Sequence, residues 1–265
     1  MEDFSSLAPQ RFIARELQGV AGRGQSAPLF VRCRSASGAQ ISVVLKLRDP
    51  RVPDHRPWNL CLVRDLVGAV IARRLGLNVP TYAIVEVDQS FIRATARHSS
   101  GPRIAANPGP NFGTVRLDAV SESIDGGVHD WAPVLAFDAL GFNADRKGAN
   151  PNTLWSGKAL FVIDHGMLAP TWTFHIDGTT AASLYGPTNI HLHASFPVLK
   201  GKGAAYLEIA SAWAERITLE FISWLRAQVP ASWASAGEVD ELFQFLGARA
   251  GIIVQQEAEL RGVVR

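Results

Sequence analysis

The stretch NADRKGAN at positions 143–150, followed by IDHG at positions 163–166, is the most informative part of this chain. It places two carboxylates, Asp145 and Asp164, and one amide, Asn150, around a turn and a predicted hairpin. Phosphoryl transfer from ATP uses such a set, with one Asp near the acceptor hydroxyl and an Asn and a second Asp holding Mg²⁺ against the phosphates. If the three side chains converge, the stretch predicts a nucleotide site.

The positions of these residues in the predicted elements favour convergence. Asp145 and Asn150 flank Gly148 on a predicted loop, and a loop held by regular elements can point both side chains into one cleft. Asp164 follows the apolar run LFVI and precedes a histidine and a glycine, so it ends a buried strand. Carboxylate and amide oxygens are ligands that Mg²⁺ accepts. The alternative is that the first two residues cap turns and the third only ends a strand.

Upstream, one amine and one glycine-rich segment could serve the phosphates. Lys46 lies in the apolar strand pattern VVLKL, from which an ammonium can pair with phosphates. The segment that contains Gly22, Gly24 and Ser26 precedes this strand, and its backbone amides could approach phosphates closely. The alternatives are an outward lysine on an edge strand and an ordinary glycine-rich turn.

Strands are predicted early in the chain and helices late, which favours an α+β fold over alternating βαβ units. Period-two patterns predict strands at 11–17, 29–33, 41–47, 82–87, 153–155 and 159–163. Period-3.6 patterns predict helices at 60–75 and 129–142, and two long amphipathic helices at about 204–228 and 236–260. Residues 170–203 are expected to be irregular.

Composition indicates one folded domain over residues 1–265, with 47% apolar and 19% charged residues. The segment 98–114 is rich in Gly, Pro and Ser and is predicted to link an N-terminal lobe (1–98) to a C-terminal lobe (115–265). The alternative is a mobile loop over the cleft between them.

Charge and cysteine content limit the partners and the compartment. The net charge of +2 does not favour nucleic acid or an anionic membrane surface, and no apolar run reaches the ~18 residues of a membrane span. The acidic start lacks the pattern of an export signal, and Cys33 and Cys61 are expected to be thiols, so a cytoplasmic location is predicted. The segment with His175, His191 and His193 is expected to be a solvated strand or loop rather than a metal site.

The sequences NADRKGAN and LFVIDHG together resemble the catalytic and metal-binding loops of HipA-like kinases. More distantly they are similar to phosphoinositide lipid kinases, where Asp-Arg-His-x-x-Asn precedes Ile-Asp-Phe-Gly. The sequence GAVIARRLGLNVP at 68–80 resembles the helix and turn after the lysine strand of HipA-like proteins, and NFGT at 111–114 resembles an element between the lobes.

The resemblance implies a two-lobed, protein-kinase-like α+β fold, with a small antiparallel-sheet N-lobe and a mainly helical C-lobe. It implies ATP and Mg²⁺ as cofactors and Ser/Thr phosphorylation of a protein as the activity. By resemblance, Lys46 would bind phosphates, Asp145 would be the catalytic Asp, and Asn150 and Asp164 would hold the metal. An antitoxin-like protein is a further partner that the resemblance implies.

Two positions depart from the family pattern. Lys147 stands where a His is common; it could neutralise phosphate charge but cannot act as a neutral imidazole. The acid expected to pair with Lys46 is Asp65, one methylene shorter than the usual Glu, so the pair requires a closer helix or a bridging water. These departures leave open a nucleotide-binding pseudokinase, and a small-molecule or lipid kinase is a further alternative.

Overall fold

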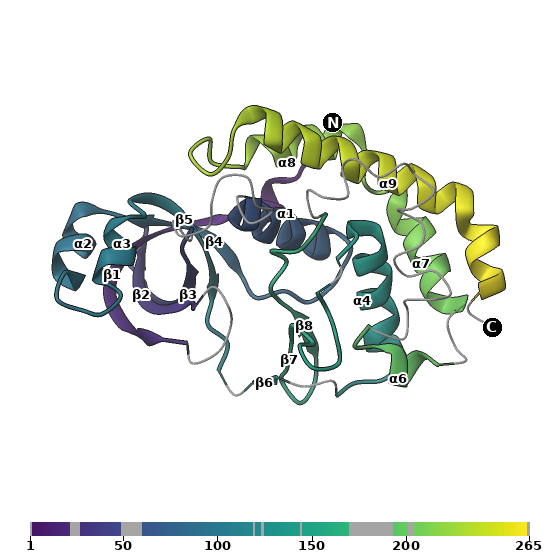
Figure 1. Cartoon of the computed structure of the whole chain (residues 1–265), viewed down its shortest axis with the longest axis horizontal. Helices are drawn as coiled ribbons and strands as arrows, with labels where there is room; N and C mark the ends of the chain where they lie inside the picture. Colours follow the sequence, from purple (N-terminus) through teal and green to yellow (C-terminus); the bar gives the residue numbers. More distant parts are fainter. Residues whose placement is uncertain are drawn as a thin grey trace.

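The computed structural model describes residues 2–21, 27–48, 60–118, 120–122, 125–143, 145–169, 193–200 and 204–263. Figure 1 shows a strand-rich part that contains the first five strands beside a larger part built mainly of helices, so the fold is mixed α and β. The two parts have separate hydrophobic clusters, one inside the strands and one among the helices.

Five strands close into a barrel in the order β1-β2-β3-β5-β4. They are β1 (Gln10–Val20), β2 (Leu29–Ser35), β3 (Gln40–Lys46), β4 (Tyr82–Val87) and β5 (Gly109–Val115). The strands predicted at 11–17, 29–33, 41–47 and 82–87 are therefore confirmed. The antiparallel sheet expected here is a closed barrel, and one of its pairs, β1 with β4, is parallel. The direction of β4 is set by its antiparallel pairing with β5, so β1 can close the barrel only in parallel.

The barrel interior is small and apolar. Inward residues include Val43 and Leu45 of β3 and Val85 of β4, all fully buried. Gly113 in β5 faces them, and a Cβ there would lie 2.6 Å from Val43 Cγ1 and 2.9 Å from Val85 Cγ2. A glycine at this place is therefore required for the strands to close around a filled core.

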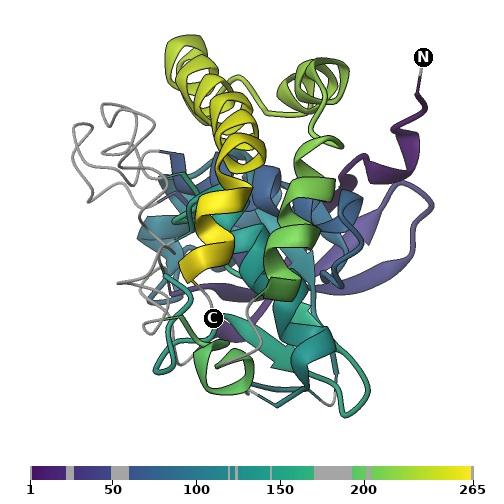
Figure 2. The same ribbon diagram turned by 90° about the vertical axis from the view of Figure 1, so that its right-hand side faces the viewer.

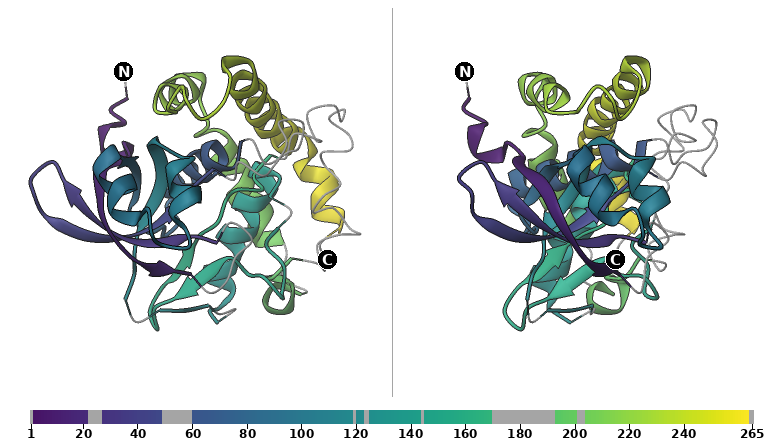
Figure 3. Two further views of the ribbon diagram at one scale, coloured as in Figure 1. Left: turned by 60° about the vertical axis from the view of Figure 1, so that its left-hand side comes forward. Right: turned by 90° about the vertical axis from the view of Figure 1, so that its left-hand side faces the viewer.

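The segment 98–114, expected to be a linker, instead contains α3 (Gly101–Ala105) and β5, which pairs with both β3 and β4. Its Gly and Pro residues suggested a connection, but the strand is specified by long-range pairing that local composition does not report. The preceding helix α2 (Gln89–Thr95) was not predicted. Phe91 of α2 and Ile104 of α3 enter the barrel cluster, and Figure 3 shows both helices beside the strands.

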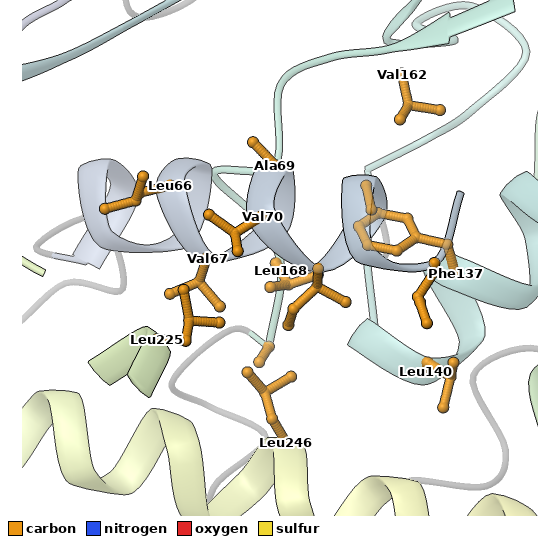
Figure 4. Packing of buried hydrophobic residues seen from close by; sticks show 14 of the residues in the cluster. Leu66, Val67, Ala69, Val70, Phe137, Leu140, Val162, Leu168, Leu225 and Leu246 are labelled. Atoms are coloured by element: carbon orange, nitrogen blue, oxygen red, sulfur yellow. The ribbon is translucent and has the colours of Figure 1, made fainter. Parts of the chain in front are cut away.

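Helix α1 (Cys61–Arg74), predicted at 60–75, lies between the barrel and the helices of the larger part. Its residues from Leu62 to Ala72 are all buried, which explains why its apolar residues do not form a single stripe. Figure 4 shows its side chains converging with others of the large cluster. The labelled residues are Leu66, Val67, Ala69, Val70, Phe137, Leu140, Val162, Leu168, Leu225 and Leu246.

Successive side chains of β4 point to opposite faces and belong to the two different hydrophobic clusters. Ala83 and Val85 face the barrel interior, whereas Tyr82 and Ile84 belong to the large cluster. Phe112 of β5 also belongs to the large cluster, and β5 contacts α1. The barrel is thereby packed against α1 through one face of β4 and β5.

The helical part is formed by α4 (Val128–Gly141), α6 (Phe196–Leu199), α7 (Ala204–Ala214), α8 (Leu219–Ala227) and α9 (Ala236–Val263). Figure 2 shows the long α9 beside α7, and both contact α4. The predictions at 129–142 and 236–260 are confirmed. The single helix predicted at 204–228 is two helices, because the chain turns after Ala214 and Thr218 starts α8 by accepting a hydrogen bond from the Phe221 amide.

A small three-stranded sheet contains the predicted hairpin and one strand that precedes α4. It contains β6 (Ser121–Glu122), β7 (Thr153–Trp155) and β8 (Leu160–Val162) in antiparallel order. The hairpin of β7 and β8 is confirmed, and the amide of Val162 donates to the carbonyl of Asn78, which follows α1. At the N-terminus, the short helix η1 (Ser5–Leu7) follows Phe4, whose ring packs on Phe221 of α8.

Candidate active site

An ion cluster joins the end of β3, the first turns of α1 and the segment that follows β8. The Lys46 ammonium lies 2.9 Å from both carboxylate oxygens of Asp65 and 2.7 Å from Oδ1 of Asp164. Lys46 is on the outer face of β3, because the neighbouring Leu45 points into the barrel. The alternative of an outward lysine on an edge strand is wrong, since β3 pairs with β2 and β5 and Lys46 bonds two carboxylates.

The protonation states of this cluster follow from its burial and its opposed charges. Burial alone would lower the pKa of Lys46, but Asp164 and Asp65 outweigh burial and hold that pKa above its usual value. The Lys46 ammonium lowers the pKa of Asp164. Burial raises the pKa of Asp65, and the attraction of Lys46 opposes this rise. The lysine is therefore charged, and the carboxylate of Asp164 beside it is ionised at neutral pH.

Asp65 also makes a contact from α1 to the segment after β8. Its Oδ1 accepts a hydrogen bond of 2.9 Å from the backbone amide of His165. The short acid therefore pairs directly with Lys46, and no bridging water is needed.

The loop after α4 gathers two amides on one carboxylate. Nδ2 of Asn150 lies 3.3 Å and Nδ2 of Asn152 lies 3.2 Å from Oδ2 of Asp145. The backbone amide of Lys147 donates to the carbonyl of Asn150, and the backbone amide of Asn150 donates to the carbonyl of Lys147. These two hydrogen bonds close a tight turn that brings Asn150 back toward Asp145. Asn152 is buried and Asn150 is exposed. Sequence reasoning missed Asn152, although an Asn two residues after the predicted ligand was a visible signal.

Asp145 and Asp164 are close enough to influence one another. Burial raises the pKa of Asp145; the Asn152 amide opposes that rise, and the charge of Asp164 adds to it. Asp164 adopts a left-handed backbone with φ 55°, and Asn152 does so with φ 47°. Such conformations in residues other than glycine are held by surrounding contacts and concentrate at functional sites. The charge interaction between Asp145 and Asp164 links the loop after α4 to the cluster around Lys46.

A buried polar network fixes this loop to α4. Arg146, which is fully buried, donates Nε to Oδ2 of Asp138 at 2.5 Å and bonds the carbonyls of Pro151 and Asn152. Nε2 of His193 lies 2.8 Å from the same Asp138 oxygen. Burial would raise the pKa of Asp138, but Arg146 and His193 hold it below its usual value. The Asp138 carboxylate is thus the fixed anion to which the loop is attached.

His193 corrects a sequence-based expectation. It was expected on a solvated strand or loop, but it is 2% exposed and bonds Asp138. The reason is that the residue after it, Ala194, donates its amide to the carbonyl of Arg146, which draws this segment into the core. His175 and His191 lie outside the described residues.

Ser195, His193 and Asp138 also form a chain that resembles a nucleophilic triad. Oγ of Ser195 lies 2.6 Å from Nδ1 of His193, and Nε2 of the same ring meets Asp138. Ser195 has no exposed surface, and Asp138 is already paired with Arg146. These hydrogen bonds therefore hold the loop in place, and the buried Ser195 hydroxyl is not presented to a substrate.

Comparison with known sequences identifies the family. The sequence profile described as HipA-like kinase matches residues 58–237, which is more than half of the chain. The chain belongs to the HipA-like kinase family. The resemblance drawn from the two loops is thereby confirmed.

A solved structure agrees with this family at the level of fold. The Helicobacter pylori proinflammatory kinase CtkA superposes with a TM-score of 0.55 at 14% identity, covering 95% of this chain and 98% of that chain. No curated protein sequence matches the chain. Together these comparisons support a kinase-type phosphotransferase with a mixed α and β kinase-like fold.

The other site residues predicted for this HipA-like kinase differ in where the structure places them. Lys147 is exposed on the turn after Asp145. Lys46 precedes the matched range, and the barrel brings it to Asp65 and Asp164. Gly22, Gly24 and Ser26 lie outside the described residues.

Proposed function

We propose that this HipA-like kinase transfers the γ-phosphate of ATP to a serine or threonine hydroxyl of a protein, with Mg²⁺ assisting. The observation that supports it most is the cluster of Lys46 with Asp65 and Asp164, beside Asp145 and its two amides. A charged lysine, an ionised carboxylate and a second acid are the groups that phosphoryl transfer uses.

Each residue has a defined role in this proposal. Lys46, held by Asp65, pairs with the phosphates of ATP. Asp145, oriented by the amides of Asn150 and Asn152, accepts the hydrogen bond of the acceptor hydroxyl and takes its proton during transfer. Lys147, exposed on the turn, adds positive charge near the phosphates. Gly22, Gly24 and Ser26 are proposed to contact the phosphates through their backbone.

The oxygens of Asn150 and Asp164 suit Mg²⁺. Mg²⁺ binds through one or two carboxylates together with phosphate oxygens and water. Asp164 and one amide oxygen are therefore enough ligands from the protein. Within the described ranges no group of three or more His, Cys, Asp or Glu could hold a metal ion, and the proposed set does not need one. When bound, the metal would neutralise phosphate charge.

The decisive experiment is phosphate transfer from ATP labelled in its γ-phosphate, to the chain itself and to a protein mixture. Asp145→Asn is expected to lower the rate by about 100-fold or more while the melting temperature stays near that of the wild type. Asp240→Asn on α9, which removes an exposed pair with Arg226, is the matched control and should keep full activity. Equal rates in Asp145→Asn and the control would refute the assignment.

The same assay separates the other candidates. A rise in melting temperature with ATP but no transfer to any acceptor would indicate a nucleotide-binding pseudokinase, the alternative motivated by Lys147 and Asp65. Transfer only to small alcohols or lipid headgroups would indicate a small-molecule or lipid kinase. The antitoxin-like partner and the cytoplasmic location stay predictions; among the described helices, none is long and apolar enough to cross a membrane.

A further inference from the structure

Helix α1 passes very close to the segment after β8, and the contact is made at Gly68. A Cβ on Gly68 would lie 2.4 Å from Cβ and 2.6 Å from Cγ of His165. Carbon atoms that are not bonded to one another do not approach so closely, so any larger residue would force the helix and the segment apart. His165 cannot turn away freely, because it is 2% exposed and its ring packs edge-on against Phe137 at 5.3 Å.

Asp65 lies on the same side of α1 as Gly68. The two are three residues apart, a spacing that places side chains on one helix face. From this face Asp65 reaches two groups across the contact, the Lys46 ammonium and the backbone amide of His165, each at 2.9 Å. The close approach at Gly68 and the reach of the short Asp65 therefore occur at the same contact.

We propose that Gly68 is a positioning residue matched to Asp65, and that its missing side chain lets α1 lie close enough for an aspartate to bridge Lys46 and the Asp164–His165 segment. The sizes agree. Moving a Cβ from 2.4 Å to an ordinary contact of 3.4 Å requires a retreat of about 1 Å. Replacing Asp by Glu extends the carboxylate by one methylene, about 1.3 Å along the side chain.

This matching predicts reciprocal compensation. Gly68→Ala alone moves α1 outward and leaves Asp65 too short, and Asp65→Glu alone has too little room. The double variant Gly68→Ala with Asp65→Glu restores the bridge at a slightly larger spacing. The consequence for catalysis rests on the proposed function, whereas the geometry of the bridge does not.

The test is a four-member cycle of wild type, both single variants and the double variant. We expect each single variant to lower the kcat for phosphate transfer about 10-fold or more, with the double variant regaining most of that loss. Gly251→Ala is the matched control, since a Cβ there meets nothing within 4 Å. A purely structural glycine would not be rescued by lengthening an acid three residues away.

Thermal unfolding of the same four proteins tests the geometry without any activity. Each single variant should lower Tm by about 3 °C or more, and the double variant should have a higher Tm than Gly68→Ala alone. If the losses in Tm simply add in the double variant, the inference is overturned whatever the enzyme does. If Tm recovers in the double variant but the wild type transfers no phosphate, the proposed function fails and the match between Gly68 and Asp65 is supported.

Discussion

At the residue scale, the two amides that meet on Asp145 differ in burial and therefore in expected role. Asn150 is exposed and free to turn toward a ligand, whereas Asn152 is buried and its carbonyl accepts bonds from Arg146 and the amide of Ile163. Asn152 thus holds Asp145 in place, and Asn150 remains the amide that we propose to bind the metal.

Single substitutions should separate these roles. Asn152→Ala is expected to lower kcat about 10-fold with an unchanged Mg²⁺ requirement, because Asp145 loses a fixed hydrogen-bond donor. Asn150→Ala should instead raise the Mg²⁺ concentration needed for half-maximal activity, because it removes a proposed ligand. Titrating Mg²⁺ against the initial rate measures both quantities, and identical Mg²⁺ curves for the two variants would contradict this division.

His165 gives the fold a defined pH dependence. Burial, with a smaller contribution from Arg146, lowers the pKa of His165 to about 3, against about 6.5 in an unfolded chain. Between these values the unfolded chain binds one more proton. The stability that His165 contributes is therefore complete above pH ~6.5 and falls as the pH drops toward 3, by up to about 1.4 kcal/mol per unit.

Urea unfolding at pH 7 and pH 5 checks this sign and size. Between pH 7 and pH 5 the free energy of unfolding of the wild type should fall by about 2 kcal/mol more than that of His165→Phe, because the variant has no group to protonate at this position. His193, also buried and with a lowered pKa, contributes to both proteins and cancels from the comparison. Equal losses would show that His165 does not remain neutral in the fold.

At the scale of elements, the loop that carries Asp145 is held mainly by α4. Asp138, on the last turn of α4, accepts hydrogen bonds from Asn143 and Arg146, which lie on either side of Asp145. Together with His193, three buried groups therefore depend on this one carboxylate. This explains why the loop position is specified by a helix residue rather than by the loop itself.

Asp138→Asn should be strongly destabilising. It leaves the Arg146 guanidinium buried without its anion, which costs about 3–5 kcal/mol when one partner of a buried pair is removed. Asp240→Asn removes a pair with Arg226 in which both side chains are nearly half exposed, and should cost about 1 kcal/mol or less. Urea titrations of the two variants at neutral pH test the contrast, and similar costs would contradict the buried-pair account.

At the scale of the whole molecule, β5 belongs to both parts of the fold. It pairs with β3 and β4 in the barrel, places Phe112 in the large cluster, and accepts a hydrogen bond of 2.7 Å at the Pro110 carbonyl from Nε1 of Trp233. Trp233 lies between α8 and α9, so this bond ties the C-terminal helices directly to a barrel strand.

Trp233→Phe should weaken that connection. It removes the donor and leaves the Pro110 carbonyl without it, at a cost of about 1–3 kcal/mol. Trp213→Phe on α7, where the ring also packs on the large cluster, controls for the smaller ring. Urea unfolding followed by circular dichroism gives the free energy of unfolding of both variants. If Trp213→Phe lowers it as much as Trp233→Phe does, the hydrogen bond to Pro110 does not stabilise the connection.

Much of this arrangement could be predicted because it depends on local sequence. Strands β1 to β4, helix α1 and the β7–β8 hairpin follow from short-range apolar periodicity, and the spacing of Asp145, Asn150 and Asp164 follows from two short motifs. β5 was mistaken for a linker, and the division between α7 and α8 was missed, because pairing with distant strands and packing decide them.

The amino-acid order by itself determined which chemical groups the site has and the family to which the chain belongs. Only the tertiary structure decided that a short aspartate reaches Lys46, that His193 enters the core, and that Asn152 joins Asp145. Each of these depends on a distance between elements remote in the chain. Such distances are set by close packing around residues such as Gly68 and Asp138, and no local pattern encodes them.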